Sequence, residues 1–141
     1  MGEKTLVEGL VTDSIRLIKN LDQSNINPAL AVWHFFEDAN EWRLLIAGQK
    51  FDQLLPKQEA LAYQKISEAI SSSDLQSLSI SLVKLVRSDD PLPEALSSLV
   101  GTPPDGIIQA NFIDTTLNGI FIKEIVILRS AIKKMHNPQI N

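Results

Sequence analysis

The 141-residue chain has no cysteine, only two histidines and only six glycines, and each shortage excludes a kind of site. Without cysteine there are no disulfides, no thiolate nucleophile and no thiolate metal ligands. The two histidines, His34 and His136, form neither an HExxH motif nor a pair at metal-ligand spacing. The glycines form no Walker-type loop and no dinucleotide-binding turn. We therefore expect no metal and no cofactor.

Long apolar runs are also missing. No run approaches the ~20 residues that a membrane-spanning helix needs. The N-terminal segment lacks the basic region and the continuous apolar region of a secretory signal peptide. With 44% hydrophobic and 21% charged residues, the composition is that of an ordinary globular protein. These features predict a cytoplasmic protein with no membrane partner.

Acidic residues predominate, and they are unevenly placed. The net charge is −4, with a balance of −7 over residues 1–118 and +3 over residues 119–141. Four basic residues near the C-terminus are too few to attract nucleic acid strongly, so we expect no nucleic-acid partner. We interpret residues 1–129 as a single α+β domain and residues 130–141 as a basic, flexible tail.

The strongest pattern lies in residues 29–48, where two runs rich in aromatic and branched residues flank a short polar segment. Such runs suit a half-buried strand, and the Asp and Asn between them suit a turn, so the segment predicts a β-hairpin. The preferred register, with a four-residue loop at 37–40, pairs Phe35 with Trp42, Trp33 with Leu44, and His34 with Arg43.

The remaining patterns complete an α+β fold. Apolar spacing predicts an amphipathic helix over residues 4–21. Later segments predict a helix from Pro56 to the serines at 71–73, a strand at 80–87, a short helix at 93–100, and strands at 107–114 and 120–129. The fold class is a mainly antiparallel five-stranded sheet with three helices, in the order α-β-β-α-β-α-β-β. Terminal hairpins favour helices gathered on one face of the sheet.

Residues 78–129 resemble a conserved bacterial α+β domain whose function is uncharacterised. The resemblance rests on the strand at 80–86, on Asp89-Asp90-Pro91-Leu92, and on the segment from Asn118 to Glu124 leading to Arg129. These are strand, turn and core residues. The resemblance implies a common fold and brings no activity and no functional residue with it.

His34 is the one candidate for chemistry, because it lies in a strand within cross-strand reach of Arg43 and Glu41. A histidine beside a carboxylate is able to act as a general base, although most half-buried histidines are simply packed. No motif marks a serine nucleophile, and we assign no catalytic residue. His34 and Arg43 are retained as candidate contacts with a ligand or partner.

By elimination, the sequence predicts a non-enzymatic binding or accessory protein that recognises another protein. The alternative is a small hydrolase or transferase that uses His34 with a neighbouring carboxylate. Several strands carry apolar residues on both faces, so either the N-terminal helix or a partner must cover the second face of the sheet. An uncovered face or a free edge strand predicts a homodimer.

Overall fold

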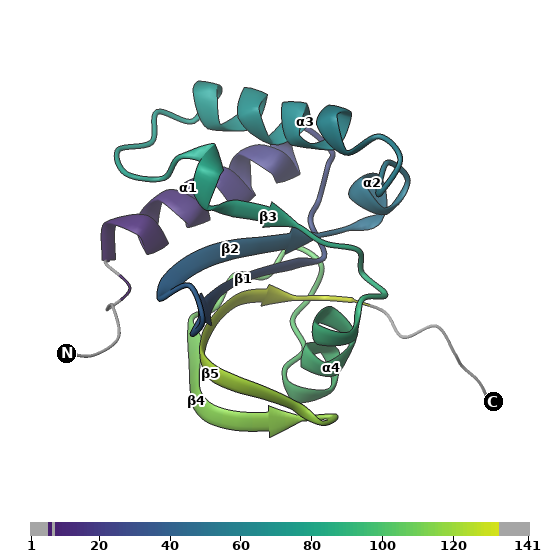
Figure 1. Cartoon of the computed structure of the whole chain (residues 1–141). Helices are drawn as coiled ribbons and strands as arrows, with labels where there is room; N and C mark the ends of the chain where they lie inside the picture. The colour runs from purple at the N-terminus through teal and green to yellow at the C-terminus, as the bar shows by residue number, and fades with distance from the viewer. Residues whose placement is uncertain (1–5, 7, 133–141) are drawn as a thin grey trace.

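The computed structural model describes Leu6 and residues 8–132, which form an α+β fold built on a five-stranded sheet (Figure 1). In chain order its helices and strands are α1 (Glu8–Gln23), β1 (Leu30–Phe36), β2 (Glu41–Ala47), α2 (Gln49–Asp52), α3 (Glu59–Ser72), the 3-10 helix η1 (Ile80–Leu82), β3 (Val83–Leu85), α4 (Pro91–Leu99), β4 (Ala110–Leu117) and β5 (Ile120–Ser130).

The strand order is β3-β2-β1-β5-β4, and every neighbouring pair is antiparallel except β2 with β3. The predicted fold class is therefore confirmed, with a mixed sheet that is mainly antiparallel. The hairpin register is confirmed as well: Phe35 lies opposite Trp42, Trp33 opposite Leu44, and His34 opposite Arg43.

Several predicted boundaries differ from the structure, and the strand expected at 107–114 is observed three residues later, at Ala110–Leu117. Only Val83–Leu85 of the expected strand at 80–87 pairs with β2, because residues 80–82 form a 3-10 turn. Pro56 lies in a turn, and the helix expected to begin there starts at Glu59. The connection after Gly48 contains a short helix, α2, that the polar sequence did not predict. At the C-terminal end β5 extends to Ser130, and residues 133–141 of the predicted tail lie outside the described residues.

Helices cover both faces of the sheet, so the prediction that they gather on one face was wrong. α1 and α3 pack on the face that carries Trp33, Leu44 and Ile46. On the opposite face, Leu96 of α4 packs among strand residues such as Val32. Figure 1 shows α4 on the far side of the sheet from α1 and α3, with β4 and β5 curving around it. The second apolar face is thus covered within the chain itself, which removes one of the reasons for expecting a homodimer.

Two adjacent polar residues, Asp13 and Ser14, are buried on the inner face of α1. The Asp13 carboxylate accepts hydrogen bonds from the backbone N–H groups of residues 76–78. Burial alone raises the pKa of Asp13, but these three donors and the positive charge of Arg16 outweigh it, so the pKa is lowered overall. Ser14 accepts a hydrogen bond of 3.0 Å from the indole N–H of Trp33. Both residues therefore fix α1 against the rest of the fold.

Candidate functional site

His34 and Arg43, the two candidates from the sequence, lie opposite each other on β1 and β2. Their side chains have different partners. The Arg43 guanidinium donates a 2.7 Å hydrogen bond to the Glu41 carboxylate. The His34 ring meets Phe36 edge to face, with 4.5 Å between ring centroids. Its Nδ1 atom is buried and has no hydrogen-bond partner among the described residues.

The surroundings of His34 keep its ring neutral. Burial lowers the pKa of His34, and the positive charge of Lys84 lowers it further, to about 4. Lys84 is held close by Phe36, whose ring centroid lies 5.3 Å from the lysine Nζ. A general base works best with a pKa near the working pH. The arrangement therefore favours a packed histidine over a catalytic one.

We expect the protein to lose stability between about pH 6.5 and about pH 4 partly through His34. Because the folded pKa lies below the ordinary value of 6.5, the unfolded chain takes up this proton first, and the free energy of unfolding falls as the pH falls. His34→Gln removes this contribution. Its unfolding free energy should therefore decline less than that of the wild type over the same interval.

Urea denaturation at a series of pH values measures this difference. Near pH 7 the substitution should change stability by only ~1 kcal/mol, the usual scale of one altered polar contact. Parallel pH profiles for the wild type and His34→Gln would show that the ring is not held neutral by burial.

A small cavity of about 220 Å³ lies beside His34, between the β1–β2 turn and β5. Its other lining residues are Phe35, Phe36, Glu37, Asp38, Phe121 and Lys123. The carboxylates and the lysine ammonium give this lining charges of both signs. The cavity therefore does not favour a ligand of one charge.

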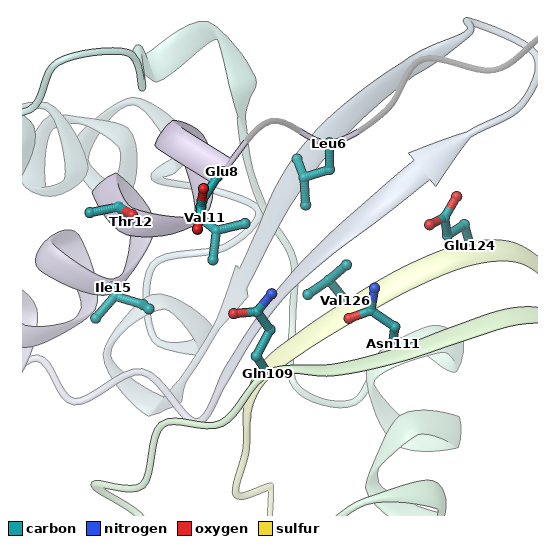
Figure 2. A pocket seen from close by; sticks show the side chains of 9 residues that line it. All are labelled: Leu6, Glu8, Val11, Thr12, Ile15, Gln109, Asn111, Glu124 and Val126. Carbon is teal, nitrogen blue, oxygen red and sulfur yellow. The ribbon is translucent and has the colours of Figure 1, made fainter.

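A larger groove, of about 370 Å³, lies between α1 and the outer face of the β4–β5 hairpin. Figure 2 shows α1 on one side and the two strands on the other, with Val11 on the helix and Gln109, Asn111 and Val126 on the strands facing the space between them. The groove is lined by Leu6, Glu8, Val11, Thr12 and Ile15 on the helix side and by Gln109, Asn111, Glu124 and Val126 on the strand side. It combines an apolar floor with amide, hydroxyl and carboxylate groups.

The hairpin beside this groove is exposed. Large apolar residues are exposed at only five of the described positions, and the two with the highest exposed fractions are Ile113 at 60% and Phe121 at 55%. Side chains alternate along a strand, so Ile113 continues the row that Asn111 begins on the groove side. The hairpin also extends beyond the rest of the sheet, because β5 begins at Ile120 but pairs with β1 only from Ile125 onward.

The two edges of the sheet differ. At the β3 edge, the Leu85 N–H donates a 2.9 Å hydrogen bond to the Tyr63 hydroxyl, so α3 blocks that edge. β4 forms the other edge, and among the described residues no strand pairs with its outer side. Asp114 has a φ of 49° and interrupts the regular alternation, so the exposed positions shift by one residue along β4. The straight part of the free edge is therefore 110–113.

Sequence reasoning placed β4 and β5 close to their true positions but did not single out Gln109, Asn111 or Glu124. Each is an ordinary polar residue with no motif around it. The groove lies between α1 and a hairpin that follows it by about a hundred residues in the chain, so only the tertiary packing brings its two sides together. The one local signal was the apolar side chain of Phe121 on the face opposite Ile122.

The described residues contain no cluster of three or more histidine, aspartate or glutamate side chains able to hold a metal ion. No helix in that part of the chain is both long enough and apolar enough to cross a membrane.

No family model, no curated protein and no solved structure matches this chain. The resemblance of residues 78–129 to a bacterial domain therefore stays a prediction. The features of the fold that bear on function are the groove, the exposed hairpin and the free edge of β4.

Proposed function

We propose that this protein is a non-enzymatic binding module that recognises another protein through the β4–β5 hairpin. The observation that carries the proposal is the exposure of Ile113 on the unpaired edge strand β4, opposite Glu124 of the groove, with Phe121 exposed on the same hairpin beside the cavity at His34. Exposed apolar residues that gather on one element are typical of interaction surfaces. An unpaired strand adds a row of backbone donors and acceptors.

The alternative, a hydrolase or transferase based on His34, has less support. The imidazole is neutral with a pKa of about 4, and Nδ1 has no hydrogen-bond partner among the described residues. Arg43 is engaged by Glu41. These contacts are those of a packed strand surface, whereas the hairpin has its apolar side chains in solvent.

Site-specific photo-crosslinking in the source organism tests the proposal. A photoreactive residue replaces Asn111 on the groove side of β4, and a matched control replaces Ser67, which is exposed on α3. We expect a discrete protein adduct from position 111 and none from position 67. Ile113→Asp should reduce the adduct by roughly tenfold, since a buried carboxylate is unfavourable in an apolar contact.

Equal labelling from both positions, or no adduct at position 111, would refute a recognition surface on this hairpin. An adduct of twice the mass of the chain would identify a second copy as the partner and so support the predicted homodimer. The folding of Ile113→Asp is checked by its melting temperature, which should change little because Ile113 is exposed.

A further inference from the structure

The partner that fits this surface is constrained by two independent features of the hairpin. The first is the free edge of β4, whose straight part covers residues 110–113. Unpaired strand edges bind extended segments, because a segment in that conformation completes the backbone hydrogen bonds of the sheet. The opposite edge is closed by Tyr63, so only the β4 side offers this pairing among the described elements.

The second feature is the charge of the groove. Nine described residues line it; two of these are glutamates, Glu8 and Glu124, and none of the nine is lysine or arginine. The described structure gives neither carboxylate an ion-pair partner. The chain as a whole has a net charge of −4. Two copies facing each other across this groove would bring like charges together, whereas a basic partner would be attracted.

Resting on the proposed function, we infer that the partner contributes an extended segment of alternating apolar and basic residues, which pairs with the edge of β4. Its side chains on the groove side lie beside Asn111 and Ile113, since neighbouring strands align their side chains. A basic side chain there lies two strand spacings, about 10 Å, from the backbone of Glu124. A lysine and a glutamate side chain together span that distance. Its apolar residues cover Ile113.

The test uses synthetic peptides and the full-length protein. The first probe is a fluorescein-labelled decapeptide of alternating valine and lysine. The second has glutamate in place of lysine. The third keeps the valine–lysine sequence but is N-methylated at its four central amides, so that it cannot pair as a strand. Fluorescence anisotropy at low salt measures their affinities. We expect the valine–lysine peptide to bind roughly tenfold more tightly than either of the others.

A charge reversal on the protein provides the matched comparison. In Glu124→Lys the charges of Glu8 and of the new lysine cancel in the groove. The ratio of the affinities for the valine–lysine and valine–glutamate peptides should therefore fall close to one. Glu68→Lys makes the same change of net charge on exposed α3 and should keep the preference. Melting curves of both variants confirm folding.

Three results would overturn the inference. Equal binding of the N-methylated peptide would show attraction without strand pairing, and equal loss of preference in Glu68→Lys would show an effect of net charge alone. Failure of all three peptides to bind would exclude an extended basic segment. If the crosslink at position 111 is still found in any of these cases, the recognition surface stands and only the partner chemistry is wrong. Loss of that crosslink refutes the proposed function itself.

Discussion

Replacing Arg129 by alanine should destabilise the protein by on the order of 3–5 kcal/mol, the range found when one member of a buried ion pair is removed. Arg129 is fully buried on β5. Its guanidinium donates to both carboxylate oxygens of Asp22 at 2.8 Å and to the backbone carbonyls of Pro28 and Gly106. Arg129→Ala leaves all these acceptors without their donors. Urea denaturation at pH 7 measures the loss.

The matched control is Arg43→Ala, which removes a partly exposed arginine from its pair with Glu41. Exposed pairs contribute little, so the expected loss is below about 1 kcal/mol. The double variant Arg129→Met/Asp22→Asn should be more stable than Arg129→Ala, because Asp22→Asn removes the carboxylate charge that Arg129→Ala leaves without a partner. Similar losses for Arg129→Ala and Arg43→Ala would show that the buried contacts of Arg129 do not stabilise the fold.

Arg129 also shows where sequence reasoning ends. The sequence placed it in a basic C-terminal region, and only the fold brings it to Asp22, 107 positions earlier in the chain. No local pattern marks such a pair. The length of β3 could not be predicted from local sequence either, because its apolar segment predicts a longer strand than Val83–Leu85. Directly after β3, the Arg87 guanidinium donates hydrogen bonds to the backbone carbonyls of Asp52 and Leu55, which holds the chain in place where it leaves the sheet.

The β1–β2 hairpin was predictable for the opposite reason. Its strands and its turn are contiguous, so residue type and loop length together fixed the pairing of Trp33 with Leu44 before any tertiary contact was considered. The candidate site was not predictable in this way. His34 and Arg43 lie where they were expected, but the groove has α1 on one side and the β4–β5 hairpin on the other, and that arrangement depends on the packing of distant elements.

Because helices cover both faces of the sheet, a partner protein cannot bind to a bare sheet face. The sequence pointed to a bare sheet face, yet α4 covers that face with residues such as Leu96. Among the described residues, the large apolar side chains with the highest exposed fractions are Ile113 and Phe121 of the hairpin, and the outer side of β4 has no paired strand. The partner that we propose would therefore contact a projecting hairpin and a groove, a surface that suits a single extended segment better than a broad, flat contact.

The second large effect is expected at Trp33, which is completely buried on β1 among residues of α1 and α3. Trp33→Ala should cost on the order of 3–5 kcal/mol, because it removes a large aromatic side chain from a packed core and leaves a cavity. The same change also leaves the Ser14 hydroxyl without its indole donor. Thermal and urea unfolding measure the total loss.

Two smaller changes separate the cavity from the hydrogen bond. Trp33→Phe keeps most of the aromatic volume, so it should be clearly less damaging than Trp33→Ala and stay folded even if the alanine variant does not. Ser14→Ala keeps the indole but removes its acceptor, at an expected cost of ~1 kcal/mol. In the Trp33→Phe background Ser14→Ala should cost less, because the indole N–H is already gone. If Trp33→Ala cost no more than Ser14→Ala, burial of the indole ring would not be what holds α1 to the sheet.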